Sequence, residues 1–496
     1  MCGIVALWNI PEPDLARAMT EKIAHRGPDA LNVTAAPSSP AVLGHCRLAI
    51  IGPEDGRQPI VQGAAALVAN GEIYNHEDLR AVLGSGAFVT QSDSEAILHV
   101  AASTRRRWVD QLDGMFAFFP ADGARFVAGR DPLGIKPLFR ARRGQGLAFA
   151  SEVKAFDGHG FEDVSPVPPG SVVDDAGRIR RWWRVPQGAA AMAPDDDVED
   201  IARGLRLVLE DAVRKWMTSD VEVGSFLSGG LDSSIIAALA TRFARGRLKT
   251  FSVGVAGSPD LVAAAKVAAH IGSEHHELAF TAEDLAGALP HVIYHLESAD
   301  VDLVRSALPT HFATALAARH VKVVLTGEGA DELFAGYTYH RGYAGQPRAL
   351  ADELTRSLTA MHNINLQRVD RITMAKGLEA RTPFLDRDLI AFAQSIPASL
   401  KLSQERGRPV EKWILRKACQ DLLPDDLVWR DKAQFDEGSG VVDALDRALG
   451  LAAGNTGAVD RDQEGRLYRQ LIEDAFIEPE IVFATAGTWT SDRVPA

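Results

Sequence analysis

The sequence predicts a chain of mixed α/β class, with sheets covered by helices first and a doubly wound parallel sheet after them. Two observations lead to this prediction. In the first third of the 496 residues, short apolar runs are separated by segments rich in Gly, Pro, Asp and Asn, as is typical of strands joined by turns. From about residue 200 onward, strand-like and helix-like segments alternate, and that order indicates a parallel sheet.

The first third contains both kinds of element. Its expected strands are the apolar runs at 4–8, 41–44, 66–69, 125–128 and 147–150. Its expected helices lie near 13–24, 76–83 and 93–103. A turn-rich stretch at 163–170 then leads to a last pair of strands that ends at Trp182 and Trp183.

A change of composition marks a boundary between two domains. Residues 186–199 mix small residues, Pro and acidic residues, which is typical of a linker. We therefore predict a first domain over residues 2–185 and a second domain over residues 200–496. Both are long enough to bury a core of their own.

The second domain follows a strand, loop, helix order before it becomes mainly helical toward residue 496. Its expected strands are 221–227, 250–255, 276–280 and 321–325. Its expected helices are 198–217, 235–245, 260–271, 282–297 and 306–319. Strands spaced by helices in this way predict a parallel, doubly wound sheet.

Charge and cysteine content exclude several classes of function. Lys and Arg total 53 and Asp and Glu total 66, so the formal net charge is −13, and we expect no nucleic-acid partner. No apolar run approaches the roughly 18 residues of a membrane span, and the N-terminus lacks a signal-peptide pattern. The three cysteines (Cys2, Cys46 and Cys419) are too few for a disulfide scaffold, and we expect a cytoplasmic protein.

Cys2 is a candidate nucleophile because it directly follows the initiator methionine. Removal of Met1 would leave Cys2 with both a thiol and the α-amino group of the chain. An α-amine has a pKa of about 7.7–8.0 and is therefore a base near physiological pH. Nucleophile and base would then belong to one residue, as terminal-nucleophile catalysis requires.

Residues 228–234 form a candidate phosphate-binding loop between an expected strand and an expected helix. Its members are Ser228, Gly229, Gly230, Leu231, Asp232, Ser233 and Ser234. The glycines let the backbone approach an anion, the serines supply donors, and a helix N-terminus adds partial positive charge. The loop lacks the Gly-Lys-Ser/Thr ending of a Walker motif, so pyrophosphate suits it as a leaving group. The alternative is a simple helix cap by Ser228 or Asp232.

A second loop, residues 325–332, also follows an apolar strand. Ligands of an open parallel sheet sit beyond the carboxyl ends of its strands, so we expect both loops at one rim. Asp232 and Asp331 are candidate ligands of Mg²⁺ on ATP, since Mg²⁺ prefers oxygen donors. Glu328 and Glu332 are open to a catalytic role or to local capping and pairing.

Five motifs of the first domain resemble class II glutamine amidotransferases over residues 2–155. They are His25–Asp29, Gly44–Ile50, Asn70–Asn75, Ser92–Glu95 and Arg130–Leu138. The resemblance implies an αββα sandwich of the N-terminal nucleophile type, with glutamine as substrate. It assigns glutamine binding to Arg47, Leu48, Asn70, Gly71, Glu72 and Asp93, with Arg47 on the α-carboxylate and Asp93 on the α-ammonium.

The same resemblance makes Asn70 and Gly71 the oxyanion hole of the Cys2 reaction. An oxyanion needs fixed donors, each of which lowers the barrier by roughly 3–4 kcal/mol. Taken singly, the residues have plainer interpretations. Asn70 and Gly71 form a dipeptide typical of a hairpin turn, Arg47 could make a surface ion pair, and Cys46 is expected to be a small buried residue.

The phosphate loop resembles that of N-type ATP pyrophosphatases, and the segments 378–386 and 429–435 extend the similarity. From Cys2 to about residue 480, the order of motifs resembles glutamine-hydrolysing asparagine synthetases. This resemblance implies ATP contacts from Leu227, Val253, Thr326 and Gly327 besides the loop, and charge stabilisation at the α-phosphate by Lys432. It also implies a homodimer and an internal route for ammonia.

The reaction implied by the resemblance converts L-aspartate, L-glutamine and ATP into L-asparagine, L-glutamate, AMP and pyrophosphate. One departure leaves the acceptor open. Asp302 and Leu303 stand where the family often has hydroxyl residues, and a negative charge facing the acceptor would disfavour a dicarboxylate. The alternatives are amidation of another carboxylic acid, a β-lactam-forming synthetase, and a ligand sensor without catalysis.

Overall fold

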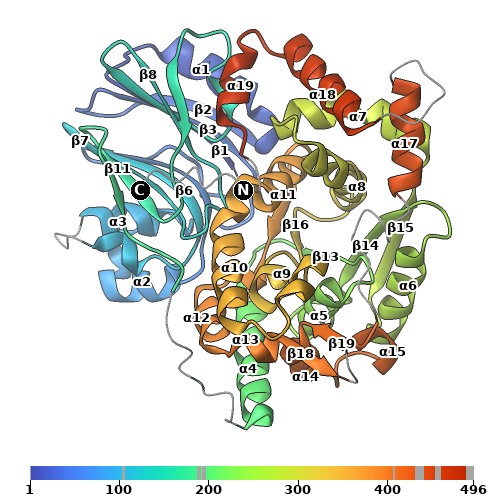
Figure 1. Cartoon of the computed structure of the whole chain (residues 1–496). Coiled ribbons are helices and arrows are strands. Elements are labelled where there is room, and N and C mark those ends of the chain that lie inside the picture. Colours follow the sequence, from blue (N-terminus) through green and yellow to red (C-terminus); the bar gives the residue numbers. More distant parts are fainter. Residues whose placement is uncertain are drawn as a thin grey trace.

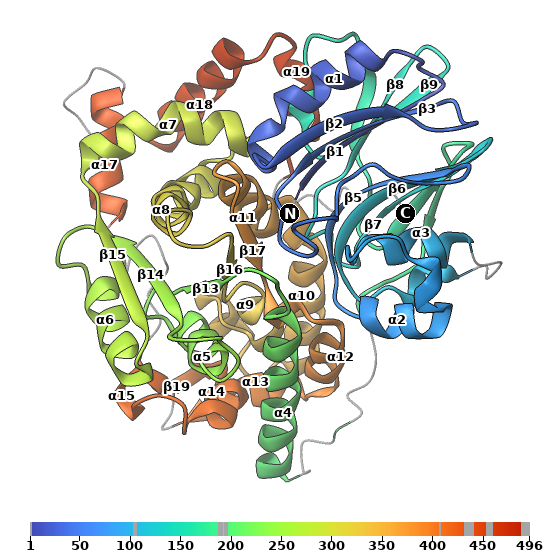
Figure 2. The ribbon, with the colours of Figure 1, turned by 180° about the vertical axis from the view of Figure 1, so that it is seen from behind.

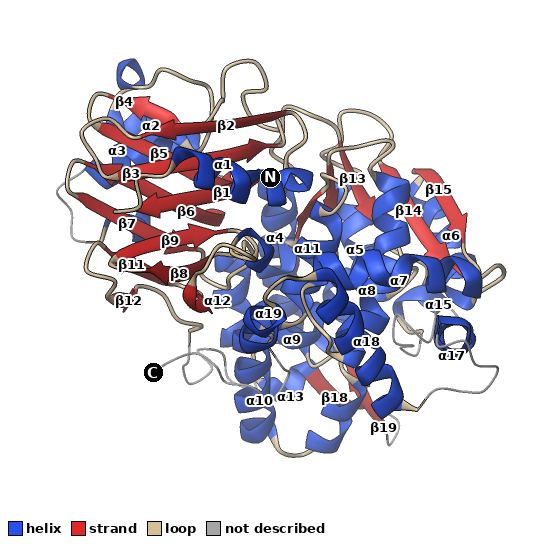
Figure 3. Cartoon of the chain, turned by 90° about the horizontal axis from the view of Figure 1, so that it is seen from above, coloured by secondary structure: helices blue, strands red, loops and turns tan. Residues whose placement is uncertain are grey.

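The computed structural model describes residues 2–102, 107–186, 192, 197–405, 408–430, 441–452 and 460–487. Most strands lie at one side of the molecule with a few helices, and most helices lie at the other side together with the strands of the parallel sheet (Figure 3). Residues 2–181 build two antiparallel sheets that we call the sandwich, and residues 198–485 build the parallel-sheet region (Figure 1). Among the described residues, no helix has the length and hydropathy needed to cross a membrane.

The sandwich contains two sheets of six described strands each. The first has the order β10 (Glu162–Pro166), β8 (Phe139–Arg143), β9 (Gly146–Ala150), β1 (Cys2–Trp8), β3 (Ala41–Arg47), β2 (Ala30–Ala35). The second has the order β12 (Ile179–Arg181), β11 (Ser171–Asp174), β7 (Arg125–Arg130), β6 (Gly114–Asp122), β5 (Ala65–Ile73), β4 (Ile60–Gln62).

Helices cover the outer faces of both sheets (Figure 2). Helix α1 (Pro13–Lys22) packs on β1 and β3, and α3 (Glu95–Ala102) packs beside α2 (His76–Leu83) on β5 and β6. Short 3₁₀ turns complete the sandwich: η1 (Ala24–Arg26), η2 (Ser85–Ala87), η3 (Trp108–Gln111) and η4 (Val153–Ala155). The order of layers is helix, sheet, sheet, helix, as the resemblance implied.

The alternation of side chains along β1 shows how the layers pack. Ile4 and Ala6 point into the core between the two sheets, where they meet Val68 and Phe119 of the second sheet. Val5 faces the opposite way and belongs to the cluster that includes α1. Alternate strand residues point to opposite faces, so a strand that is apolar throughout is covered on both sides.

The parallel-sheet region is built on a five-stranded parallel sheet within the described residues. Its order is β15 (Glu274–Ala279), β14 (Lys249–Gly254), β13 (Val223–Phe226), β16 (Val323–Leu325), β17 (Glu379–Arg381). The chain runs outward from β13 to β15 and then returns to the other side of β13 with β16. The carboxyl ends of β13 and β16 therefore flank a topological switch point, where such sheets bind ligands.

Helices lie on both faces of this sheet. Val323 and Leu325 of β16 pack in the cluster that contains α5 (Leu231–Ala240), whereas Val324 packs in the cluster that contains α8 (Val301–Ala317). The other helices of this region are α4 (Val198–Trp216), α6 (Pro259–Ile271), α7 (Ala282–Leu296), α9 (Ala330–Phe334), α10 (Pro347–Ala360), α11 (Asn365–Met374), α12 (Arg387–Ser395), α13 (Ala398–Lys401), α14 (Trp413–Cys419), α15 (Asp425–Val428), α17 (Val441–Ala452), α18 (Arg461–Ala475) and α19 (Pro479–Thr485).

Smaller elements complete the parallel-sheet region. They are the hairpin β18 (Leu402–Glu405) and β19 (Arg408–Glu411), and the 3₁₀ turns η5 (Thr338–Tyr343), η6 (Met361–Asn363) and η7 (Pro383–Leu385). The hairpin and β17 are short strands within a stretch that is mainly helical, as the sequence predicts. Three residues are too short to show strand periodicity, which explains why β17 is not visible in the sequence.

The sandwich and the parallel-sheet region share their apolar cores. Leu48 and Met115 of the sandwich pack in the same cluster as Leu205 and Leu209 of α4. On the other side, residues of β1 belong to a cluster that includes α7 and α8. The interface is therefore part of the core and stabilises the two regions against each other. Most of the expected linker, 186–199, lies outside the described residues.

A matched pair of leucines on α4 tests this account of the core. Leu209 is fully buried, whereas Leu207 is 59% exposed. We expect Leu209→Ala to destabilise the protein by about 2–5 kcal/mol because it removes buried methyl groups and leaves a cavity. Leu207→Ala should change stability by less than about 0.5 kcal/mol. Thermal unfolding of both variants beside the wild type measures the difference, and equal melting temperatures would contradict the assignment of the buried face.

Two candidate active sites

Cys2 is the first residue of β1 and lies beside the second sheet of the sandwich. Its side chain is 8% exposed, and its backbone nitrogen donates to Asn70 Oδ1 at 2.9 Å. Its carbonyl oxygen accepts from Arg26 Nε at 3.1 Å. The backbone of the candidate nucleophile is therefore held on both sides of its α-carbon.

Burial raises the pKa of the Cys2 thiol, and the negative charges of Glu72 and Glu379 act in the same direction. A thiol of this kind is protonated at neutral pH and needs a base before it can attack. The nitrogen that donates to Asn70 becomes the free α-amine when Met1 is removed. Base and thiol then sit on one residue, as the sequence predicts.

Asn70 and Gly71 lie inside β5, paired with Ala117 and Phe116. The hairpin-turn interpretation of this dipeptide is therefore wrong. Asn70 is completely buried, and its Nδ2 has no hydrogen-bond partner in the described part of the chain. An unpaired buried amide costs stability unless a ligand satisfies it. This donor therefore suits an oxyanion that forms only during a reaction.

Gly71 has to be glycine for steric reasons. Its φ is +144°, and a Cβ at this position would lie 1.9 Å from the carbonyl oxygen of Met115. The close approach of β6 therefore explains the glycine. It also leaves the backbone next to Asn70 free of side-chain cover.

The predicted glutamine-binding residues gather around Cys2. Arg47 is the register partner of Cys2 across β1 and β3 and is 6% exposed. Its guanidinium donates to the carbonyl oxygens of Gly52 and Pro53, at 2.5 and 3.0 Å. The surface ion-pair interpretation of Arg47 is therefore wrong. Leu48 follows it and is buried.

Asp93 and Glu72 supply the negative charge of this first site. Asp93 accepts from the backbone nitrogen of Ile73 at 2.6 Å, and burial raises the pKa of its carboxyl group. Burial and the charge of Glu379 raise the pKa of Glu72 as well. A bound α-ammonium group would favour the ionised form of either carboxylate. Cys46, as expected, is a small buried residue, with its Sγ against the carbonyl oxygen of Ile23.

The second site is a cavity of about 610 Å³ at the switch point of the parallel sheet. Nearly all predicted ATP-binding residues line it: Leu227, Ser228, Gly229, Gly230, Leu231, Asp232, Ser233, Val253, Thr326 and Gly327. Ser234 lies beneath the loop, where its Oγ donates to the carbonyl oxygen of Gly230. Lys432 lies outside the described residues.

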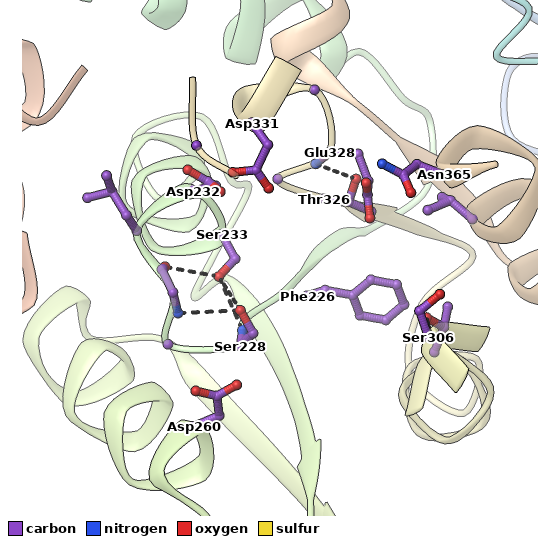
Figure 4. A pocket seen from close by; sticks show the side chains of 18 of the residues that line it. Phe226, Ser228, Asp232, Ser233, Asp260, Ser306, Thr326, Glu328, Asp331 and Asn365 are labelled. Carbon is purple, nitrogen blue, oxygen red and sulfur yellow. Dashed lines mark hydrogen bonds between the residues drawn. The ribbon is translucent and has the colours of Figure 1, made fainter. Parts of the chain in front are cut away.

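The phosphate loop is closed by its own serines. Ser228 and Ser233 share a hydrogen bond between their Oγ atoms at 3.0 Å. Ser233 Oγ also accepts a hydrogen bond from the backbone nitrogen of Ser228 (Figure 4). Helix α5 begins at Leu231 rather than at the expected Ile235, with Gly230 as its N-cap and no side-chain cap. The capping interpretation of Ser228 or Asp232 is therefore wrong, and the loop backbone faces the cavity.

Gly229 shows how closely the phosphate loop packs on its neighbour. Its φ is +75°, and a Cβ there would lie 2.6 Å from the backbone nitrogen of Ala264 in α6. Any side chain would force the loop away from α6 and into the cavity. Glycine thus keeps the cavity open at the point where an anion would approach.

Asp232 and Asp331 lie side by side at this rim (Figure 4). Lys412 bridges them, with its Nζ 2.5 Å from Asp232 Oδ2 and 2.6 Å from Asp331 Oδ1. Asp232 Oδ1 is buried and has no hydrogen-bond partner in the described segments. Two adjacent carboxylates with a spare oxygen fit Mg²⁺, which takes one or two carboxylates together with phosphate oxygens.

Lys412 is a candidate site residue that the sequence does not reveal. It is 3% exposed, and although burial opposes its charge, Asp232 and Asp331 raise the pKa of its ammonium group. The residue follows β19 in a left-handed backbone conformation. A lone lysine in a polar segment carries no sequence signal, because only the fold brings it to both carboxylates. Among the described residues, no group of three or more His, Cys, Asp and Glu side chains could hold a metal ion.

The far wall of the cavity carries paired charges. Arg368 of α11 forms an ion pair with Glu328, and both line the cavity. Glu332 accepts from Tyr337 Oη at 2.5 Å and from Asn365 Nδ2 at 3.0 Å. Both glutamates therefore make local pairs, which was one of the two alternatives for them. Glu328 also lines the cavity.

Asp302 and Arg305 differ in their relation to this cavity. Asp302 lies at the rim with its side chain 82% exposed, and it pairs with Arg461. Arg305 turns away and is held by Glu464 and Asp446. The charge of Asp302 is therefore paired and solvated, which weakens its effect on an acceptor, while Asp302 and Leu303 both line the cavity.

The geometry defines a class of protein with two sites, namely a terminal-nucleophile sandwich of the glutamine amidotransferase type joined to a nucleotide-binding parallel sheet. Residues 1–166 match the glutamine amidotransferase domain family, and residues 204–349 and 343–487 match the asparagine synthase family. The chain belongs to the family of glutamine-hydrolysing asparagine synthetases.

Individual relatives agree with this membership. The chain is 37% identical over 465 residues to asparagine synthetase [glutamine-hydrolyzing] 2 of Oryza sativa subsp. japonica, covering 89% of this chain and 78% of the relative. It is 38% identical over 466 residues, with the same coverage, to asparagine synthetase [glutamine-hydrolyzing] of Asparagus officinalis. The solved structure of glutamine phosphoribosylpyrophosphate amidotransferase from B. subtilis is 20% identical, covers 56% of this chain and 65% of its own, and has a TM-score of 0.33.

Glu332→Gln tests the burial of the acid beside the second site. Burial, followed by the charge of Asp331, raises the pKa of Glu332 to about 7 from its usual 4.5. The folded state holds this proton more tightly than the unfolded chain does. Wild-type stability should therefore fall as pH rises from about 4.5 through about 7. Glutamine does not titrate, so the melting temperature of the variant should rise relative to the wild type across this interval. A difference that is independent of pH would contradict a neutral Glu332.

Proposed function

We propose that the chain makes L-asparagine from L-aspartate, with ammonia taken from L-glutamine and energy from ATP. One observation carries the proposal. A single chain combines Cys2 beside the unpaired Asn70 amide with a glycine-paired loop beside the acidic pair Asp232 and Asp331. The two halves are complementary, since the ammonia released in the first site needs an activated carboxylate as acceptor in the second.

In the first site, we assign Cys2 as the nucleophile and its own α-amine as the base. The thiol attacks the side-chain amide carbon of glutamine and its proton passes by way of the amine to the leaving ammonia. Asn70 Nδ2 and the Gly71 nitrogen stabilise the oxyanion, and Arg47 offers the α-carboxylate two parallel donors. Asp93 holds the α-ammonium. Water then hydrolyses the thioester and releases glutamate.

In the second site, we assign ATP to the loop 228–234 and to Leu227, Val253, Thr326 and Gly327. A carboxylate oxygen of the acceptor attacks the α-phosphorus, and pyrophosphate leaves into the donors of the loop. Ammonia then displaces AMP and forms the amide. Lys432 belongs to this proposal as the cation at the α-phosphate, on the strength of the family pattern alone.

Asp232 and Asp331 are the residues that would hold Mg²⁺, which supplies positive charge to the phosphates. Lys412 occupies the space between these carboxylates and keeps them together in its absence. Lys412 would share these carboxylates with bound Mg²⁺, and its ammonium group could then also neutralise phosphate oxygens.

Aspartate is the acceptor that the charges of the second site support best. Arg368 and Glu328 offer one cation and one anion in the cavity, matching a carboxylate and an ammonium group. Asp302 and Leu303 line the cavity, but the pairing of Asp302 with Arg461 and its exposure to solvent reduce the charge that would favour another carboxylic acid. A panel of acids in a pyrophosphate-release assay tests the assignment, and a faster signal with an acid other than aspartate would overturn it.

Cys2→Ala separates the two sites. The variant should lose glutamine-dependent asparagine formation by a factor of at least about 1,000, because it removes the nucleophile assigned to the first site. Synthesis driven by added ammonium should continue at the wild-type rate, because Cys2 does not touch the second cavity. Amino-acid analysis of the products with each nitrogen donor measures both activities. Loss of both would refute the division into two sites.

Asp232→Ala should remove the activity of the second site and spare that of the first. Removal of this carboxylate should abolish aspartate-dependent exchange of pyrophosphate into ATP, since it takes away one half of the acidic pair. Glutaminase turnover should persist, because the variant leaves the sandwich intact. Exchange at the wild-type rate would remove Asp232 from the metal and ATP assignment. Release of orthophosphate in place of pyrophosphate would refute the proposed reaction itself.

A further inference from the structure

The sandwich alone supplies every residue that the family pattern assigns to glutamine, yet side chains of the parallel-sheet region also act on the first site. Besides the charge of Glu379, Asp220, Asp370 and Arg381 make contacts there. Asp220 and Asp370 touch groups that in turn hold residues of the site, whereas Arg381 touches Glu72 itself.

Asp220 acts on Arg47 through the loop at Gly52. The Gly52 nitrogen donates to Asp220 Oδ2 at 2.9 Å, and the Gly52 carbonyl oxygen accepts from Arg47 Nη2 at 2.5 Å. Asp220 precedes β13 and belongs to the parallel-sheet region. Its carboxylate therefore holds Gly52, the residue whose carbonyl oxygen orients the Arg47 guanidinium.

Arg381 acts on Glu72 and is completely buried. Its Nη2 lies 3.5 Å from Glu72 Oε1, and its Nε donates to Glu379 at 2.5 Å. Its Nη1 donates to the carbonyl oxygens of Trp216 and Thr218, at 2.9 and 2.6 Å. The guanidinium is thus held by the parallel-sheet region and aimed at a carboxylate of the glutamine site.

Asp370 acts on Cys2 through Arg26. Arg26 Nη1 donates to Asp370 Oδ2 at 2.8 Å and to Glu152 at 2.6 Å, and Arg26 Nε donates to the Cys2 carbonyl oxygen at 3.1 Å. Asp370 lies on α11, whereas Arg26 and Glu152 belong to the sandwich. The orientation of the nucleophile's backbone therefore depends on a carboxylate from the other region.

We propose that the parallel-sheet region positions the glutamine site, with Asp220, Arg381 and Asp370 as positioning residues. Asp220 sets the binding of the α-carboxylate through Arg47, and Asp370 sets the attack by Cys2 through Arg26. Arg381 sets the place of Glu72. The inference rests on the proposed glutaminase activity and adds to it the residues that shape the site from outside the sandwich.

Asp220→Ala is the first test, because Asp220 is exposed and its loss should leave folding intact. We expect the KM for glutamine to rise about 3- to 10-fold with little change in kcat, since one hydrogen bond that orients Arg47 is lost. Asp211→Ala, at an exposed position of α4, is the matched control and should leave KM unchanged. Synthesis from ammonium and the melting temperature should match the wild type in both variants.

A glutamine analogue with its α-carboxylate converted to an amide makes the test specific. The analogue cannot form a charged pair with Arg47, so Asp220→Ala should affect it less than it affects glutamine. The KM ratio of analogue to glutamine should therefore fall in Asp220→Ala and stay constant in Asp211→Ala. A general loosening of the site would raise both KM values equally, and that result would overturn the role of Asp220.

Asp370→Asn tests the second contact with an opposite kinetic signature. Arg26 keeps Glu152, but its link to α11 weakens, so kcat of glutaminase should fall about 10-fold with KM nearly constant. Asp388→Asn, whose side chain is 85% exposed, is the matched control. A wild-type kcat in Asp370→Asn would overturn the role of Asp370. Absence of glutaminase in the wild type would instead refute the proposed function, so the two failures are distinguishable.

Discussion

Arg26 is the contact on which both halves of the molecule depend. Its side chain is completely buried, and it joins Glu152 of the sandwich to Asp370 of α11 while it donates to the carbonyl oxygen of Cys2. Although burial opposes its charge, the two carboxylates keep the pKa of Arg26 above its usual range. Removing one partner of such a cluster leaves an uncompensated charge in a dry environment, which is costly. The cluster therefore links the position of the Cys2 backbone to the relative position of the two regions.

The two sites use different physical means to prepare for negative charge. The first contains a buried amide of Asn70 whose Nδ2 has no hydrogen-bond partner among the described residues, an arrangement that suits an oxyanion. The second uses backbone, hydroxyl groups and the N-terminus of α5, with Lys412 holding the acidic pair in place. Asn70 lies in β5, which is paired with β6 along its whole length. The second site is an open cavity of about 610 Å³.

Sequence reasoning predicted the elements whose signals are local. The apolar runs near β1, β3, β14 and β16 and the motifs around Cys2, Asn70 and Ser228 could be identified because each signal lies within a few residues. Lys412, Arg381 and β17 could not be predicted in this way. Arg381 is a charged residue in a three-residue strand, and its burial follows from the carbonyl groups of Trp216 and Thr218, which are distant in the sequence. The early start of α5 also depends on the tertiary position of Gly230, since no capping side chain marks it.

The shared apolar clusters have a consequence for any attempt to divide the chain. Leu48, Ile50 and Met115 pack against α4 and its neighbours, so a fragment ending near residue 185 would expose them to water and favour aggregation. The fragment would retain Cys2, Asn70 and Arg47 in its sequence but would lack three of the groups that surround them. Sandwiches exchanged between relatives would meet the same obstacle. The nitrogen-releasing half is thus a dependent part of a single folded body and not a module that can be transplanted.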